Sequence, residues 1–430
     1  MNTSINKGIT KYSFILLLFL PVVLVGQRTL TLDDCFDRVT KNYPLAKQSV
    51  LLQSQAELDI ATLKKDKLPR LDVNAQATYQ SDVTHLPIEL PNISVTPPNK
   101  DQYRATLDAS LLIYNGGLID ATAKVKESNS KVSEQEVNVN LYALKNKVNQ
   151  LYLSLLLLQE NRSLLAAKEK QLQSRIEEVQ AGVLYGTLLP SSADALQVEL
   201  LNIKQKYAEI DYSKKGLTQR LALLIGSDLS ADAILQTPMV PTENQTDSQR
   251  PELTLFELKK AQIDLSKQQL TKSKLPKLNA FAQGGYGNPG LNMLDNSFKT
   301  FYMTGLKLNW NIFDWNKTKG QKQSLEINKE IINTQKETFE LNTNLELVQL
   351  QSEIDKLQDF IDMDSEIIRI RENMVKSAAS QLKNGVITSS AYITEFTDLY
   401  EAKSNLALHK TQLLLLQIQY QLTNGTYGKY

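Results

Sequence analysis

Residues that could carry out chemistry are few in this chain and lie far apart. The 430 residues include two histidines, His85 and His409, and one cysteine, Cys35. A zinc site needs three or four His, Cys or carboxylate ligands in one place, and covalent catalysis needs a nucleophile beside a base. No HExxH, phosphate-binding, dinucleotide-binding or serine-elbow motif occurs. We therefore expect no catalytic, cofactor-binding or metal site, and no enzyme.

Three features that resemble sites have simpler interpretations. The segment GGYGNPG (284–290) lacks the lysine and the helix of a phosphate loop, and it is typical of a strand end and turn. Asp33 and Asp34 are typical of the first turn of a helix, where acids are favoured by the helix dipole. Cys35 follows two acids rather than the small residues of a lipid-attachment site, so we expect a small residue on that helix.

Composition and the N-terminus indicate an exported protein. The 48 basic and 47 acidic residues give a net charge of +1, which provides no attraction to nucleic acid. Lys7 and Lys11 precede an apolar run at 14–25 that ends at Gly26 and is shorter than the roughly 20 residues of a membrane span. This pattern predicts a signal peptide at 1–26.

The chain contains an internal repeat. KLPRLDVNAQATYQ begins at Lys67, and KLPKLNAFAQGGYG begins at Lys274. Pro44 and Pro251 precede these phrases at equal distances, which predicts one helix per repeat, bounded by prolines at 44–69 and 251–276. We place the first repeat at 27–226, a linker at 227–249 and the second repeat at 250–430.

Each of these helices is followed by two segments with alternating apolar and polar residues. They predict β-hairpins at 70–114 and 277–313 with one apolar face, as in outer-membrane barrel strands, although Phe281 interrupts the polar side. The residues expected to face lipid are Leu71, Val73, Tyr79, Leu107, Leu111, Ile113, Leu306, Leu308, Trp310 and Ile312. The residues expected to face a water-filled lumen are Asp72, Asn74, Gln76, Asp108, Ser110, Lys307 and Asn309.

Very long helices follow each hairpin. Residues 118–181 and 321–384 contain no glycine or proline, and each stretch would span roughly 95 Å as a helix. Each ends at a glycine, Gly182 or Gly385, and then returns as another helix. The tips are expected near 182–192 and 385–390, and the first tip is expected to be longer because of Gly186 and Pro190.

Four strands per chain predict an assembly. An open sheet edge in hydrocarbon leaves backbone groups unpaired, so the sheet must close, and the smallest common barrels have eight strands. Two chains would give eight strands and three would give twelve; three is favoured because twelve leave a water-filled passage. The expected fold is a mixed α/β membrane protein, with an α-barrel of long helices and a four-strand contribution to a trimeric β-barrel. The alternative is a periplasmic coiled-coil structural or adaptor-like protein.

Several segments resemble the TolC-like outer-membrane efflux proteins. They are LTLDDCFDRVTKNYPLAK, with Cys35 where alanine is usual, KLPRLDVNA, LLIYNGG, LALLIG and RPEL, and their order covers most of 27–425. The resemblance implies a homotrimer in the outer membrane of a Gram-negative bacterium, in contact with outer-membrane lipid, with its helices in the periplasm. It also implies a passive exit duct for an efflux pump or type I secretion system, served by a periplasmic adaptor and an inner-membrane RND or ABC-type transporter.

The same resemblance implies roles for the helical tips. The adaptor-contacting turns correspond to Gly182, Val183, Leu184, Gly385, Val386 and Ile387. The acidic ring that narrows the closed tip in well-known members falls on Ala391 and Thr394, so this sequence departs from the family there. Nearby acids that could serve a periplasmic gate are Asp194, Glu395 and Asp398, although the favoured interpretation of each is a solvated acid in the first turn of a helix.

Overall fold

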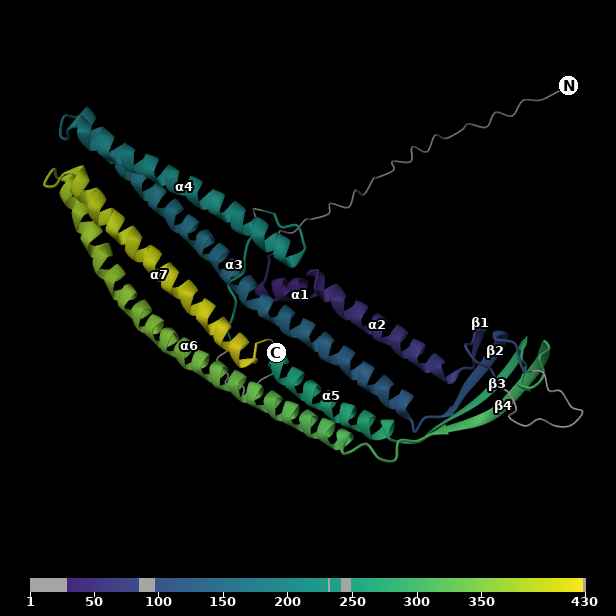
Figure 1. The fold of residues 1–430 in the computed structure, drawn as a ribbon. Helices are drawn as coiled ribbons and strands as arrows, with labels where there is room; N and C mark the ends of the chain where they lie inside the picture. Colours follow the sequence, from purple (N-terminus) through teal and green to yellow (C-terminus); the bar gives the residue numbers. More distant parts are fainter. Residues whose placement is uncertain (1–28, 85–96, 231–232, 241–248, 428–430) are drawn as a thin grey trace, which may run out of the picture.

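The computed structural model describes residues 29–84, 97–230, 233–240 and 249–427; the expected signal peptide and His85 lie outside them. Figure 1 shows an elongated molecule, with helices over most of its length and a small sheet at one end. Its elements in chain order are α1 (Leu32–Asn42), α2 (Ala46–Lys64), the 3-10 helix η1 (Lys65–Lys67), β1 (Arg70–Tyr79), β2 (Asp101–Tyr114), α3 (Leu118–Leu184), α4 (Pro190–Ile225), α5 (Pro251–Ser273), β3 (Lys277–Asn288), β4 (Lys299–Asn309), α6 (Lys317–Lys383) and α7 (Ser389–Asn424).

Two helices, α3 and α6, run nearly the whole length of the helical part. Each has 67 residues, or roughly 100 Å at about 1.5 Å per residue. The half of α3 near the sheet packs against α2 and the other half against α4, while α5 and α7 pack in the same way on α6 (Figure 1). The predicted long helices are confirmed. They extend further than the glycine-free runs, because α3 includes Gly182 and α6 includes Gly320.

The proline-bounded helices are confirmed with one shift. Pro251 occupies the first turn of α5, as expected. In the first repeat the helix begins at Ala46 rather than at Pro44. Tyr43, the residue before that proline, is extended with φ −61° and ψ 137°, because a following proline disfavours the helical conformation. Pro44 therefore lies in the turn that separates α1 from α2.

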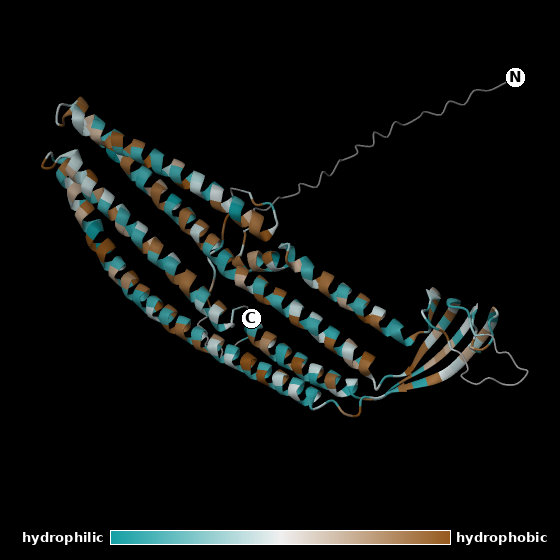
Figure 2. Cartoon of the chain, in the orientation of Figure 1, coloured by the Kyte–Doolittle hydropathy of each residue, from teal (hydrophilic) through white to brown (hydrophobic). Residues whose placement is uncertain are grey.

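Apolar and polar residues alternate along every long helix (Figure 2), and the buried ones form two clusters. One lies at mid-length and contains residues of α1, α3, α4 and α7; the other lies near the tips, among α3, α4, α6 and α7. Cys35 is fully buried in the first cluster, and burial raises the pKa of its thiol to about 12. This confirms the expected packing role of Cys35, because a protonated thiol is unreactive at neutral pH.

The four strands form one antiparallel sheet in the order β1-β2-β3-β4. The pairing of β2 with β3 joins the two repeats. Within the described residues no strand pairs with the outer edge of β1 or of β4, so the sheet is open on both sides. No helix in the described part of the chain is both long and apolar enough to cross a membrane.

Candidate functional site

The register of the sheet separates its polar and apolar side chains onto two faces. Residues paired across an antiparallel ladder lie on the same face. Asp72 pairs with Asp108, which pairs with Gln283. All seven residues expected on the polar face do share one face: Asp72, Asn74, Gln76, Asp108, Ser110, Lys307 and Asn309.

A hydrogen-bonded cluster covers the middle of this polar face. The side chains of Asn74 and Thr106 each donate to Oδ2 of Asp108 at 2.8 Å, and Gln283 donates to its other oxygen. Arg70 Nε lies 2.9 Å from a carboxylate oxygen of Asp72. Strands that supply charged and amide groups to one face can line an aqueous passage, because these groups form hydrogen bonds with water.

Two phenylalanines on the polar face fill space above glycines. A Cβ built on Gly285 would lie 2.4 Å from the ring of Phe301, and one on Gly305 would lie 2.9 Å from the ring of Phe281. Each pair is directly opposed in the β3–β4 ladder. Phe281 therefore interrupts the polar pattern because its ring covers a glycine of the neighbouring strand.

The opposite face of the sheet carries exposed apolar side chains. Leu71, Val73, Leu107, Leu306 and Leu308 are all more than half exposed. Tyr79 and Leu111 also belong to this face of the ladder.

Three residues that we expected on the apolar face lie outside the regular ladder. Ile113 is in a β-bulge between Leu112 and Tyr114. Trp310 and Ile312 lie beyond the last residue of β4, Asn309, in the turn that leads to α6. Trp310 is instead held by a hydrogen bond from its indole nitrogen to the carbonyl of Lys274, at 3.1 Å.

The two helical tips have the same geometry, which corrects the expected match between them. Gly186 and Gly385 both adopt left-handed backbone angles, with φ +73° and +69°, one residue after the C-caps of α3 and α6. Gly385 therefore corresponds to Gly186, not to Gly182, and the first tip is not longer. Gly182 lies inside α3, where its carbonyl accepts from the backbone of Thr187 and Leu188; a Cβ there would displace only the end of the Leu188 side chain, 2.8 Å away.

The tip residues divide into exposed and packed ones. Leu184 and Val386 are 80% and 72% exposed, whereas Val183 and Ile387 pack on the tip cluster. A hollow of about 530 Å³ between α6 and α7 is lined in part by Ile387, Ala391 and Glu395. The exposed apolar residues at the extreme end are available for contact with another protein.

Two of the expected gate acids, Glu395 and Asp398, already share a partner within the chain. Arg371 of α6 lies 2.8 Å from Asp398 and 3.3 Å from Glu395, both on α7. Thr394 donates its hydroxyl to the carbonyl of Ser390, and the backbone of Ala391 is capped by Thr388. Asp194 lies on α4, in the first repeat.

The acids of α1 and the histidine of α7, whose types could carry out chemistry, have structural partners. Asp34 and Thr31 form a capping box at the start of α1, and Asp33 accepts the hydroxyl of Tyr427 at 2.9 Å. His409 Nδ1 lies 2.6 Å from Asp364, between α6 and α7. Both acids of the pair are therefore helix-start residues, as expected.

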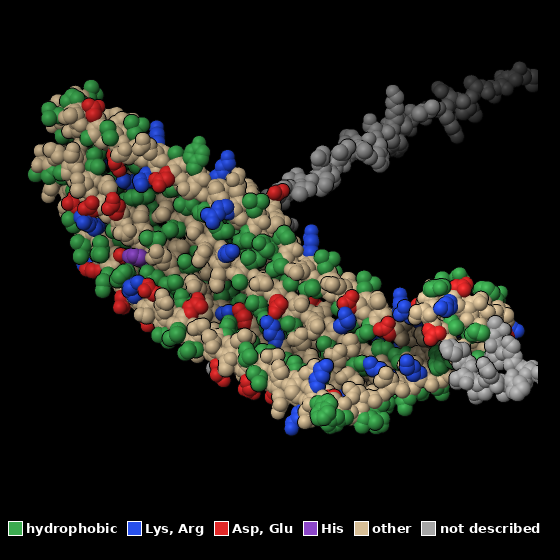
Figure 3. Space-filling model, viewed as in Figure 1, with side chains coloured by type: hydrophobic (Ala, Val, Ile, Leu, Met, Phe, Trp, Pro, Cys, Tyr) green, Lys and Arg blue, Asp and Glu red, His purple; other side chains and the backbone are tan. Residues whose placement is uncertain are grey.

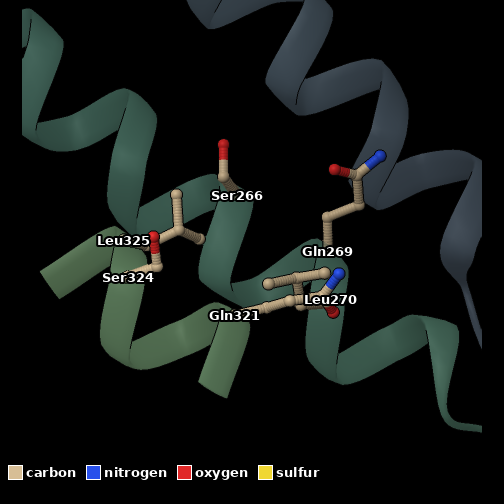
Figure 4. Close-up of a pocket in the computed structure, with 6 residues that line it drawn as sticks. All are labelled: Ser266, Gln269, Leu270, Gln321, Ser324 and Leu325. Atoms are coloured by element: carbon tan, nitrogen blue, oxygen red, sulfur yellow. The ribbon is translucent and has the colours of Figure 1, made fainter. Parts of the chain in front are cut away.

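A hollow of about 340 Å³ lies between α5 and α6 and has neutral walls. Figure 4 shows that its lining comes half from α5 and half from α6: Ser266, Gln269, Leu270, Gln321, Ser324 and Leu325. Gln269 also donates to Thr122 of α3 at 2.8 Å. Amide and hydroxyl groups without an ionisable neighbour supply neither a general base nor an activated nucleophile.

Comparisons with known proteins agree with this architecture. A sequence profile of the family described as outer membrane efflux protein matches residues 37–227 and 244–424, which is one segment per repeat. No curated protein sequence matches the chain.

Solved structures have the same fold at low sequence identity. CusC aligns at 14% identity and a TM-score of 0.66, covering 92% of each chain. VceC of Vibrio cholerae aligns at 16% and 0.63, covering 92% of this chain and 96% of its own. The open state of the MtrE outer membrane channel of Neisseria gonorrhoeae aligns at 16% and 0.63, covering 92% and 89%.

The family match covers both repeats and most of the chain, and it does not favour the alternative of a periplasmic structural protein. The duplicated hairpins and paired long helices follow the same division into two segments. This chain therefore belongs to the outer membrane efflux protein family, whose members act as outer-membrane channels for efflux.

Proposed function

We propose that three copies of this chain form one outer-membrane duct, in which twelve strands close a barrel and the long helices continue it into the periplasm. The observation that carries the proposal is the open four-stranded sheet, apolar on one exposed face and polar on the other. In hydrocarbon, each unpaired backbone group at a sheet edge costs several kcal/mol. Edge β4 of one copy would therefore pair with edge β1 of the next.

The two faces of the sheet would then have different surroundings. The apolar face, which includes Leu71, Val73 and Leu306, would contact outer-membrane lipid. The polar face, with the Asp108 cluster at its centre, would keep the passage hydrated. The chain would act as a passive conduit.

The helical tips would provide the contact with the other proteins of the export system. The exposed residue Leu184 ends α3 and the exposed residue Val386 lies in the turn after α6, and Figure 1 shows these ends of α3 and α6 farthest from the sheet. A periplasmic adaptor would dock there and connect the duct to an inner-membrane transporter of the RND or ABC type, in an efflux pump or a type I secretion system. That transporter would supply the energy.

Cross-linking between neighbouring chains tests the closed barrel. In a Cys35→Ala background, one cysteine is placed at Ala75 in β1 and a second, one position at a time, at Tyr302, Thr304 or Leu306 in β4; all four lie on the apolar face. Oxidation in isolated outer membranes should join chains at one of these positions, in a ladder that ends at three. A ladder that ends at two, or no cross-link at any position, would contradict the trimer.

Site-specific photo-cross-linking tests the docking role of the tips. A photoreactive amino acid at Val386 should capture a periplasmic adaptor in living cells. The matched control is Tyr212, which is equally exposed but lies partway along α4. Equal capture at both positions would argue against a specific contact at the tip.

A further inference from the structure

The turn between strand and long helix has the same backbone in both repeats but very different residues. In the first repeat, Gly116 and Gly117 have φ +69° and +77°. At the equivalent positions of the second repeat, Trp315 and Asn316 have φ +52° and +61°. A left-handed conformation costs an L-residue roughly 1–2 kcal/mol, and for a bulky residue it is a genuine outlier. A tryptophan at this position calls for a contact that offsets that cost.

The second-repeat turn presents aromatic rings to the outside. Trp310 and Trp315, the only two tryptophans of the chain, are 54% and 85% exposed. The rings of Phe313 and Trp315 meet edge to face at 4.8 Å. This aromatic group directly follows β4 in the chain, and Leu306 and Leu308 of β4 lie on the apolar face of the sheet.

Lysines surround a hollow beside this turn. A space of about 450 Å³ between α5 and α6 is lined by Lys267, Lys274, Lys319 and Lys322, together with Glu326 and neutral residues. Lys267 pairs with Glu326, and Lys274 lies 3.0 Å from Asp314. Lys319 and Lys322 have no acidic partner among the residues that the structure describes.

The first repeat lacks this arrangement. The positions equivalent to Lys317, Lys319 and Lys322 are Leu118, Asp120 and Ala123, since α3 and α6 have equal lengths and begin at equivalent residues. Asp120 instead pairs with Lys67 at 2.7 Å. Figure 3 shows hydrophobic and basic side chains next to each other at the junction between helices and sheet.

We propose that the turn at 310–316 and the lysines at the start of α6 form a binding site for anionic phospholipid at the periplasmic surface of the outer membrane. The aromatic rings would enter the headgroup region, where amphipathic rings are favoured. Lys319 and Lys322 would hold the lipid phosphate, because a lysine near an anionic surface contributes roughly a fivefold preference. The inference rests on the proposed insertion of the sheet into the membrane, because Leu306 and Leu308 place the turn at the edge of the lipid-facing surface.

Tryptophan fluorescence provides a direct readout. A Trp310→Phe variant leaves Trp315 as the single tryptophan, and it is reconstituted into two sets of vesicles with the same content of phosphatidylglycerol and phosphatidylcholine. Bromine, which quenches tryptophan on contact, is carried by the phosphatidylglycerol in one set and by the phosphatidylcholine in the other. We expect severalfold stronger quenching, per brominated molecule, by the phosphatidylglycerol.

Two double variants complete the test. Lys319→Ser with Lys322→Ser should remove the difference between the two lipids, while Lys204→Ser with Lys215→Ser, on α4 and far from the turn, should preserve it. Equal quenching by both lipids in the Trp310→Phe protein would overturn the headgroup site while leaving the membrane position of the turn intact. Absence of quenching in a protein inserted as an oligomer would overturn the inference alone. Failure to insert at all would overturn the proposed function and the inference with it.

Discussion

The two repeats share one backbone plan but fill it with different side chains. Helices α3 and α6 have 67 residues each, α4 and α7 have 36 each, and the tip glycines have matching dihedral angles. Equivalent positions nevertheless differ in charge, size and burial. The backbone turns therefore fall at equivalent positions in both repeats, whereas the side chains between the turns differ.

Ion pairs near the tips show this divergence most clearly. Glu199 and Asp398 occupy equivalent positions on α4 and α7. Glu199 pairs with Lys168 of α3 at 2.7 Å, and their side chains are only 13% and 7% exposed. Asp398 pairs with Arg371, which lies one helical turn further along α6 than the position equivalent to Lys168, and both groups are about one-third exposed.

The largest predicted difference between the repeats comes from these pairs. Lys168→Ala should lower the free energy of unfolding by roughly 3–5 kcal/mol, because it leaves the Glu199 carboxylate buried without a cation. It also removes the ammonium that lies 4.7 Å from the centre of the Tyr400 ring. Arg371→Ala should lower the free energy of unfolding by at most about 1 kcal/mol, since water screens the charges of its two partners. Denaturant unfolding of the purified oligomers measures both.

A double variant separates charge burial from lost packing. Lys168→Met with Glu199→Gln should recover most of the stability, because neither buried group then carries a charge. Equal losses for Lys168→Ala and Arg371→Ala would show that burial of the first pair has no energetic consequence.

The turns at the base of the sheet give the next largest effect. Gly116→Ala should destabilise the oligomer by roughly 2–4 kcal/mol, because left-handed strain adds to a Cβ that would lie 2.3 Å from Leu275. Gly117→Ala is the matched control: it has the same left-handed angle but open space around it, so only about 1 kcal/mol is expected. The temperature at which the oligomer dissociates on a gel reports the difference, and identical shifts for the two variants would contradict the steric argument.

The opposite sign is expected at the equivalent position of the second repeat. Trp315→Gly should stabilise the protein in detergent by about 1 kcal/mol, because glycine adopts φ +52° without strain. The temperature at which the oligomer dissociates, measured for Trp315→Gly and Gly116→Ala under the same conditions, would compare the two repeats directly. A destabilised Trp315→Gly protein in detergent would show that the contact of Trp315 with Phe313 outweighs the backbone strain.

The smallest predicted effect is a dependence on pH at the strand-to-helix turn, which the turn of the second repeat should show and that of the first should not. Asp314 accepts hydrogen bonds from Thr318 and Lys274, which lower its pKa from 3.8 to about 2. Its equivalent in the first repeat is Asn115, which does not titrate and accepts from the backbone of Gly117. A carboxylate with a lowered pKa stabilises the folded state above about pH 4, and that contribution is lost as the pH falls towards about 2.

Fluorescence of Trp310 and Trp315, which flank Asp314, should therefore change between about pH 4 and pH 2 in the natural sequence. Asp314→Asn should flatten that change. A transition that persists in Asp314→Asn would assign the acid response to another group.

Most of the fold could be predicted because the spacing of apolar residues agrees with the positions of glycine and proline. Glycine-free runs predicted α3 and α6, and two-residue alternation predicted all four strands, including the common face of Asp72 and Asp108. The end of β4 was placed too late, because Trp310 and Ile312 continue the alternation after the ladder has stopped. Periodicity describes side chains and contains no information on which backbone groups are paired.

The match between the tips was wrong for a related reason. Gly182 and Gly385 are both followed by Val and an aliphatic residue, and this likeness concealed the true correspondence of Gly385 with Gly186. The same offset that relates α3 to α6 and α4 to α7 pairs Gly385 with Gly186, and the positive φ of both glycines agrees with it. The ion pairs of Lys168 and Arg371 could not be predicted either, because they join helices whose relative rotation the sequence leaves open.

The open edges of the sheet have a genetic consequence. If each copy depends on its neighbours to complete the ring, an altered β1 or β4 that still folds will be incorporated beside intact copies and will spoil every channel that it joins. Such alleles should be dominant when co-expressed with the natural gene. Alleles that destroy the long helices should be recessive, because their products never reach the ring.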